Sequence, residues 1–436
     1  MQRNPKSTHF ITLLLLFTLL LAACGPEEAT APLEAAEIHW LTFDTNNQAE
    51  AAVMKKYQET QPQISFKRDG RFRGGLFGDF LPDPAPDLLT ATADFDYLQA
   101  VHSEQLADLS ELWDEAQLTD KIPQNVRSLI ELDGKPFMTP LAVNWSAIYY
   151  NKAVFAQAGL QPPTTWDEFV EVCEQLILNG EIPLVITGNR SYSFMLWFDM
   201  LDLRINGAQF HRDLLDGKEH FDDPRVRPVI EHWKLLFERN YFVDNPQYLS
   251  DMAASNSLIR DDKGMLRGPK AAMMLLDSRT VSEMPPKFRD ELDFFPFPTI
   301  DPAIPAAEAA TVIGFAIPRA ADHTAQAIDF LSYINSAEAQ NLLLLPNQSA
   351  SAAFVPARTD FDANTTSPQL TRAIEYIHSV PQLAPQAYIW MPREMWFGFN
   401  TGYTHFLNKK TYDIDLFIAD LQKAQDDAKA KGSYQE

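Results

Sequence analysis

The sequence predicts an α/β protein built from two lobes, each a β-sheet flanked by helices. Its 436 residues are more than one hydrophobic core usually supports. Its apolar share of 46%, with 11% aromatic residues, is sufficient to fill two cores. Beyond the N-terminal segment, strand-like and helix-like patterns alternate along the chain. This alternation favours a parallel sheet with covering helices.

The alternation is clearest between residues 37 and 101. "EIHWLTF" (37–43) has the pattern of a buried strand, "NNQAEAAVMKKYQETQP" that of a helix ending before Pro62, and "ISFKRD" that of a second strand. A third strand is predicted over 87–92. Apolar spacing from Tyr97 to Val101 then predicts another helix.

Three later segments complete the predicted elements. In "PPTTWDEFVEVCEQLI", Thr165 and Glu168 have the spacing of a capping box and predict a helix start. The proline-rich region 284–310 predicts a strand followed by a crossing segment. "TVIGFAIP" (311–318) predicts a buried strand, and "HTAQAIDFLSYINSAEAQNLLL" an amphipathic helix.

The N-terminus has the anatomy of a lipoprotein signal. Positive residues precede an apolar run over 10–21, which is too short for a spanning helix of about 20 residues. The run ends in Leu-Ala-Ala-Cys, which resembles the bacterial lipobox, with Cys24 as the residue that receives lipid. The alternative is an ordinary signal peptide with a chance cysteine. We expect 1–23 to be the signal peptide and 24–36 a flexible tether.

These features predict an extracytoplasmic protein held to the cell membrane through Cys24. Cys173 is the only other cysteine, so no intrachain disulfide is expected once Cys24 carries lipid. Asn144-Trp145-Ser146 matches the N-glycosylation pattern, but the pattern carries little weight on a bacterial export route.

Composition and motifs argue against several functions. The formal net charge of −23 argues against nucleic acid as a partner and against electrostatic docking on anionic lipid. The sequence contains none of the common hydrolase, metalloprotease, nucleotide-binding or redox motifs. Its histidines are scattered, so no metal site and no cofactor are predicted. Paired acids of a glycoside hydrolase stay open, because their spacing is three-dimensional.

Several segments, in order, resemble one family, the extracellular solute-binding proteins of ABC importers, in their carbohydrate-binding branch. The segments are "APDLLTATADFDYLQAVHSEQLADLSEL", "GKPFMTPLAVNWSAIYYNKAVFAQAGLQPPTTWDEF", "GPKAAMML", "TVIGFAIPRAADHTAQAIDFLSYINSAEAQ" and "YDIDLFIADLQKAQDDA". The second is the most similar, with its Tyr-Asn-Lys triplet and Pro-Thr-Thr-Trp-Asp-Glu-Phe helix start. Together they extend over nearly all of 37–430.

The resemblance implies a type II periplasmic-binding-protein-like fold, in which hinge strands join two α/β lobes and a ligand cleft lies between them. It suggests residues 37–141 plus 311–350 for the first lobe and 142–310 plus 351–436 for the second. One departure concerns the ligand. Where family members often carry Gly-Pro-Trp or Gly-Ser-Trp, this chain has Asp277-Ser278-Arg279, which replaces a stacking aromatic with charge and a hydroxyl.

A sugar presents an apolar ring face and a rim of hydroxyl groups, so its site combines aromatic with planar polar side chains. In open α/β folds such groups gather beyond the carboxyl ends of strands. On these grounds and the resemblance, nine residues are predicted to contact the ligand: Asp44, Asp94, Asn144, Trp145, Trp197, Asp277, Arg279, Arg393 and Trp396. For Asp44 and Asp94 the alternative is a helix cap, and for Trp145 and Trp197 it is a place in the core.

The resulting prediction is a monomeric, lipid-anchored substrate-binding protein of an ABC importer. It is expected to capture a sugar or oligosaccharide between its lobes, to perform no chemistry on it, and to deliver it to separate permease subunits. Two alternatives remain: a secreted carbohydrate-active lipoprotein enzyme, or the same fold with a polyamine or glycerophosphodiester as ligand.

Overall fold

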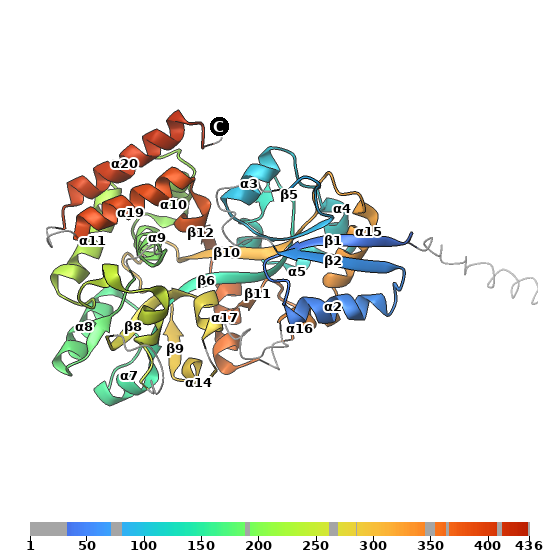
Figure 1. The fold of residues 1–436 in the computed structure, drawn as a ribbon. Helices are drawn as coiled ribbons and strands as arrows, with labels where there is room; N and C mark the ends of the chain where they lie inside the picture. The colour runs from blue at the N-terminus through green and yellow to red at the C-terminus, as the bar shows by residue number, and fades with distance from the viewer. Residues whose placement is uncertain are drawn as a thin grey trace, which may run out of the picture.

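Two lobes lie side by side in the computed structural model, with strands running from one to the other (Figure 1). The structure describes residues 33–70, 81–187, 192–260, 269–284, 286–344, 354–362, 366–407 and 412–434. The predicted signal peptide, the lipid attachment site at Cys24 and most of the predicted tether lie outside these ranges.

The first lobe is built on the part of the sheet with strand order β2-β1-β3-β10-β6. β1 pairs in parallel with β2 and β3, and β10 pairs antiparallel with both β3 and β6. The strands are β1 (Ala36–Thr42), β2 (Ile64–Gly70), β3 (Leu88–Thr92), β6 (Thr139–Asn151), β10 (Ala307–Ala316), and the short β4 (Glu131–Leu132), β5 (Lys135–Pro136) and β11 (Val355–Pro356).

Seven helices that precede residue 345 in the described chain belong to this lobe. They are α2 (Gln48–Gln58), α3 (Phe95–His102), α4 (Ser110–Glu115), α5 (Leu118–Lys121), α6 (Gln124–Arg127), α15 (Thr324–Ile334) and α16 (Ala337–Leu344). The strands predicted over 37–43 and 87–92 and the helix predicted at Tyr97 are confirmed. The single helix predicted after residue 322 is wrong, because two helices form there. Ser336 accepts a hydrogen bond from the Ala339 amide (3.2 Å) and so begins a second helix.

The second lobe surrounds a smaller sheet with many helices. Its strands are β7 (Ile182–Leu184), β8 (Ala271–Asp277), β9 (Leu292–Phe295) and the second half of β6. Its helices are α7 (Lys152–Ala158), α8 (Trp166–Leu178), α9 (Ser193–Ile205), α10 (Gly207–Leu215), α11 (Val226–Glu238), η2 (Pro246–Tyr248), α12 (Asp251–Asn256), α13 (Ser278–Glu283), α14 (Pro286–Arg289), α18 (Ala387–Trp390), α19 (Arg393–Leu407) and α20 (Ile414–Ala430). The predicted capping box of Thr165 and Glu168 is present at α8.

Two long strands belong to both lobes. β6 pairs with β10 as far as Trp145 and with β8 from Ser146 onward. β10 pairs with β12 (Gln382–Pro385) at its start and with β3 at its end. At the register shift in β10, a Cβ on Gly314 would collide with the carbonyl oxygen of Thr139, so the close approach of β10 to β6 requires glycine there.

The predicted lobe boundaries at 141/142 and 310/311 fall within these shared strands. The described segments 355–362 and 366–380, predicted for the second lobe, contact the first. Pro356 pairs with Ala142, and the Asn125 amide donates to the carbonyl of Ile377 (2.9 Å) in α17 (Pro368–Ser379). We therefore propose that the chain re-enters the second lobe at β12 rather than at residue 351.

Two clusters of buried apolar side chains form the core, and they meet on opposite faces of β6. Trp145 and Tyr149 belong to the cluster that fills the first lobe and continues beneath β8 and β9, whereas Ile148 and Tyr150 belong to the cluster on the other face, in the second lobe. This division follows the two-residue period of a strand. In the described part of the chain, no helix combines the length and apolarity needed to cross a bilayer.

Candidate ligand-binding site

The carboxyl ends of β3 and β8 both lie at the junction of the two lobes, with β10 and β6 between them. Just after β3, Ala93 donates its amide to Val312 (2.8 Å) and accepts from the hydroxyl of Thr311 (3.0 Å). Thr311 pairs with Asn144 on β6, and two residues further Ser146 pairs with Asp277 at the end of β8. Polar residues that follow the two strands are thereby brought to one place between the lobes.

Asn144 holds the start of α13 at this place. Its side-chain oxygen accepts from the Ser278 hydroxyl (2.9 Å) and from the Arg279 amide (2.9 Å), and the residue is only 3% exposed. The predicted residue Asn144 therefore lies at the site, where its hydrogen bonds position α13. The Arg279 side chain extends from this first turn and is exposed.

Asp277 is the N-cap of the same helix. Its carboxylate accepts the amide of Thr280 (2.7 Å), and its side chain is buried. Burial raises the pKa of Asp277 above its usual range, while hydrogen bonds from Thr280, the charge of Arg279 and a hydrogen bond from Asn144 act in the opposite direction.

Two tyrosines complete this cluster from the second lobe. Tyr192, at the start of α9, and Tyr388, in α18, have ring centroids 5.0 Å apart and an interplanar angle of 39°. The Tyr192 hydroxyl is hydrogen-bonded to the hydroxyl of Thr280 (2.5 Å). Both rings are partly exposed. Burial and the charge of Asp277 raise the pKa of Tyr388, so its hydroxyl stays protonated at neutral pH and can donate.

The first lobe contributes Asp94. This residue caps α3 by accepting the amide of Tyr97 (3.0 Å), so its capping role is observed, and its side chain is also partly exposed. Its negative charge helps to raise the pKa of Tyr388, which places Asp94 within electrostatic reach of the second lobe. On the same helix, Leu98 packs against the second-lobe core.

Two predicted tryptophans lie in the core instead. Trp145 is 1% exposed and packs against Phe294 and Tyr376, with ring centroids 5.5 Å apart in each case. Trp197, in the middle of α9, is fully buried against the ring of Phe242. We leave both out of the proposed site because their rings are covered by other side chains.

The remaining three predicted residues lie elsewhere. Asp44 is exposed in the turn before α2, where its carboxylate accepts the Asn46 amide (2.9 Å). Arg393 is exposed in the first turn of α19 and lies over the ring of Phe397, 5.3 Å from its centroid. Trp396 is partly buried beside the same ring. Their contact with ligand stays a prediction.

Sequence reasoning missed Tyr388 and did not select Tyr192 or Thr280. The sequence feature that could have pointed to Tyr388 is its position shortly after Pro385, where the strand β12 ends and the chain enters the second lobe. For Tyr192 and Thr280 the signal is their place in the first turns of α9 and α13, beside the ends of strands.

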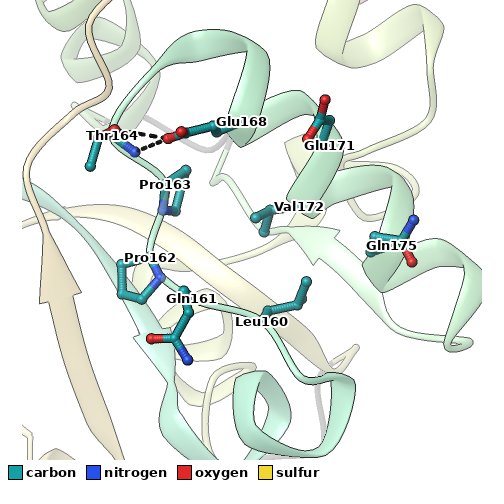
Figure 2. A pocket seen from close by; sticks show the side chains of 9 residues that line it. All are labelled: Leu160, Gln161, Pro162, Pro163, Thr164, Glu168, Glu171, Val172 and Gln175. Atoms are coloured by element: carbon teal, nitrogen blue, oxygen red, sulfur yellow. Dashed lines mark hydrogen bonds between the residues drawn. The ribbon is translucent and has the colours of Figure 1, made fainter.

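A cavity of about 350 Å³ lies beside α8 on the second lobe (Figure 2). It is lined by the loop before this helix and by the helix itself: Leu160, Gln161, Pro162, Pro163, Thr164, Glu168, Glu171, Val172 and Gln175. Its acid Glu168 points back to Thr164 and accepts from the amide (2.7 Å) and the hydroxyl (2.8 Å) of that residue. This carboxylate therefore serves the start of α8. Among the described side chains, no three potential metal ligands converge.

The fold and the junction site define a class, the two-lobed solute receptors. The structure resembles the crystal structure of the bacterial solute receptor AcbH, with a TM-score of 0.77 and 21% identity, covering 91% of this chain and 98% of that one. AcbH is described as having an exclusive substrate preference for β-D-galactopyranose.

The sequence shows the family. The model for bacterial extracellular solute-binding proteins matches residues 44–341, and the chain belongs to this family. An uncharacterised ABC transporter extracellular-binding protein of Pyrococcus horikoshii is 24% identical over 72% of this chain and 70% of its own. A multiple sugar-binding protein of Streptococcus mutans is 25% identical over 44% of this chain and 46% of its own.

Proposed function

We propose that this protein is the lipid-anchored receptor of an ABC importer and that it captures a sugar or oligosaccharide between its lobes. The ligand contacts the Tyr192–Tyr388 pair, Asp94 and Arg279, while the buried Asp277 caps the start of α13, from which Arg279 extends. Cys24 carries the lipid, and separate permease subunits receive the ligand. The receptor performs no chemistry on it, and one copy of the chain is sufficient for capture.

The single observation that carries this proposal is the tyrosine pair beside charged planar groups at the lobe junction. Two partly exposed rings 5.0 Å apart provide an apolar surface for a sugar ring. Arg279, just after β8, and Asp94, just after β3, provide donors and acceptors for the hydroxyl rim. The sugar-binding relative and the galactose-specific AcbH support the same ligand class.

Capture requires groups from both lobes. Asp94 belongs to the first lobe, whereas Tyr388 and Arg279 belong to the second. A ligand that contacts all three gains part of its binding free energy only when the lobes are closed, so it shifts the population toward the closed form. The closed form then presents both lobes to the permease.

The test is a thermal-shift and calorimetric screen with D-galactose, maltose, chitotriose, xylotriose, spermidine and glycerophosphocholine. A specific ligand raises the melting temperature by mass action. We expect a sugar to do so, and we expect Tyr388→Ala to abolish the shift. Tyr248→Ala is the matched control, because Tyr248 is 81% exposed in the short helix η2. A shift with spermidine or glycerophosphocholine alone would overturn the sugar assignment.

The same sample tests the absence of chemistry. After incubation with the protein, the bound sugar should be recovered unchanged by chromatography, and any cleavage product would favour the enzyme alternative. For the anchor, Cys24→Ser should release the protein from the membrane fraction and prevent incorporation of labelled fatty acid. Retention of the label in this variant would contradict lipidation at Cys24.

A further inference from the structure

Residues 385–387 connect β12 to α18, and each of them has a buried hydrogen-bond partner on another element. The carbonyl of Pro385 accepts from Nε2 of His211 on α10 (3.1 Å). The side-chain amide of Gln386 donates to the hydroxyl of Ser146 on β6 (2.9 Å). The backbone amide of Ala387 donates to both carboxylate oxygens of Asp199 on α9 (3.2 Å each).

These partners are shielded from water. Asp199, His211 and Gln386 are all 0% exposed. The ring of His211 is fixed at both nitrogens, because Nδ1 bonds to a carboxylate oxygen of Asp202 (2.8 Å) while Nε2 donates to the Pro385 carbonyl. Asp199 lies 3.7 Å from the same ring. The side chains of Asp199, Asp202 and His211 therefore form one buried cluster beneath residues 385–387.

The residue that follows this segment is Tyr388. Its position is therefore set by the hydrogen bond of Ala387 to Asp199 and by the anchoring of Pro385 through His211. The ring of Tyr388 in turn lies beside that of Tyr192, and burial and the charges of Asp277 and Asp199 raise the pKa of its hydroxyl. The buried cluster and the ligand-binding ring are thus connected through two peptide units.

We infer that Asp199 and His211 are positioning residues for ligand capture, because they fix the segment Pro385–Ala387 and with it the ring of Tyr388. This inference rests on the proposed function only in taking Tyr388 as a ligand contact. Neither residue touches the ligand, since both are fully buried.

The charged groups around the cluster give the inference a pH signature. Asp199 faces His211 and Asp202, and burial raises the pKa of Asp199 to about 7. Burial lowers the pKa of His211, but Asp202 and Asp199 outweigh it and leave the pKa raised. When Asp199 loses its proton near pH 7, its bond to the Ala387 amide becomes charge-assisted and stronger. The hydrogen bond from Ala387 to Asp199 is therefore stronger above pH 7.

Hydrogen exchange of the 383–390 segment, measured on the full chain by mass spectrometry, tests this positioning directly. We expect Asp199→Ala and His211→Ala to speed exchange in this segment at least tenfold relative to the rest of the second lobe. Asp199→Asn should restore most of the protection, because its side-chain oxygen still accepts from Ala387, but it should lose the change in protection near pH 7.

Glu50→Ala is the matched control for loss of a buried carboxylate. Glu50 is 4% exposed on α2 in the first lobe, accepts from the Thr42 hydroxyl (2.7 Å), and has a pKa raised to about 7 by burial. This variant should lower the melting temperature and leave exchange in 383–390 unchanged. Equal exchange in Asp199→Ala and wild type would overturn the inference.

Titration of D-galactose and maltose separates this inference from the proposed function. If either sugar binds the wild type, its affinity should fall at least tenfold in Asp199→Ala and stay constant in Glu50→Ala. Unaltered affinity in Asp199→Ala would overturn the inference and leave the receptor function intact. If neither sugar binds, the sugar assignment is weakened, and the exchange result alone decides the positioning role.

Discussion

The two faces of β6 differ in what they contribute to this receptor. On one face, Asn144 and Ser146 are hydrogen-bonded to residues that position α13 and the segment before Tyr388. On the other, Trp145 is enclosed by aromatic rings, among them that of Tyr376, whose hydroxyl donates to the buried Glu308. Consecutive residues on one strand thus belong to two different environments.

The comparison shows how a hinge strand can serve two purposes. Because side chains alternate along a strand, one face can hold the polar groups of a site while the other fills the core. We expect changes on the Trp145 face to alter stability and changes on the Asn144 face to alter ligand affinity.

Trp145→Ala should cause the greatest loss of stability. Removing a fully enclosed indole leaves a cavity and costs about 3–5 kcal/mol. Denaturant unfolding should show this loss of stability. The affinity of the folded protein for sugar should stay within about twofold of wild type, which is a small change in binding free energy because about 1.4 kcal/mol corresponds to tenfold. Trp396→Ala is the control, since this ring is only partly buried and should cost less. Loss of binding by folded Trp145→Ala would show that the two faces are not separate.

The free energy of unfolding should fall as pH rises from 5 to 8. Burial raises the pKa of Glu50 and of Asp199 to about 7, so the native state binds protons that the unfolded state has already lost. Each such group removes up to about 3 kcal/mol of stability by the time the pH has passed 7. The raised pKa of His211 acts in the same direction, because its stabilising charge is lost as pH rises.

Below pH 4 the direction reverses. Hydrogen bonds from Ser110 and the ammonium of Lys135 lower the pKa of Asp108 to about 2, and the stability that this carboxylate provides is lost as acid protonates it. Maximum stability is therefore expected near pH 5. Denaturant titrations at several pH values across this range measure the free energy of unfolding. In Glu50→Gln, its fall between pH 5 and 8 should be smaller than in wild type. A profile that rises from pH 5 to 8 would contradict the assignment of these two carboxyl groups.

Asn144→Ala should reduce both stability and affinity. It removes acceptors for the Ser278 hydroxyl and the Arg279 amide, at about 1 kcal/mol for each hydrogen bond. The first turn of α13 then loses its fixed position, and sugar affinity should fall about tenfold, which corresponds to about 1.4 kcal/mol. Calorimetry measures this, with Ser278→Ala as the variant that removes only one of the two bonds. Unchanged affinity would exclude a positioning role for Asn144.

Much of the fold could be predicted from local patterns. The capping box of Thr165 and Glu168 and the strand that begins near residue 37 depend on neighbours in the chain, and both were found where expected. The break at Ser336 was missed because a single capping hydroxyl interrupts an apolar pattern that continues past it. The crossing at β12 depends on pairing with β10, about seventy residues away, and no local signal specifies it.

The candidate site likewise depends on residues that are far apart in the chain, and its ligand contacts stay a prediction. Asp94, Asn144, Asp277 and Arg279 follow or flank strands, so the topology implied by the family brings them together. Trp145 was predicted for the same site with a place in the core as the alternative, and its ring lies on the opposite face of β6 from Asn144, in line with the alternation of strand side chains. Tyr388 was missed because its place depends on the buried contacts of Asp199 and His211, which only the folded chain shows.

The smallest expected effects come from two tyrosine hydroxyls, one on each face. The Tyr376 hydroxyl donates to the buried carboxylate of Glu308 (2.5 Å), and the Tyr192 hydroxyl is bonded to that of Thr280 (2.5 Å). Tyr376→Phe should lose about 1–2 kcal/mol of stability, because a charge-assisted bond disappears in a buried place, and should bind sugar normally.

Tyr192→Phe should show the opposite balance. Its ring remains against Tyr388, so stability should change by less than about 0.5 kcal/mol, as for other partly exposed positions, while affinity falls about threefold as Thr280 and Tyr192 lose their fixed orientation. Unfolding curves measure the stability of both variants, and calorimetry measures their affinity for sugar. We expect Tyr376→Phe to lose stability and keep its affinity, and Tyr192→Phe to do the reverse. If Tyr376→Phe weakens sugar binding as much as Tyr192→Phe does, a change on one face of β6 alters the site on the other, and the proposed separation of the two faces is wrong.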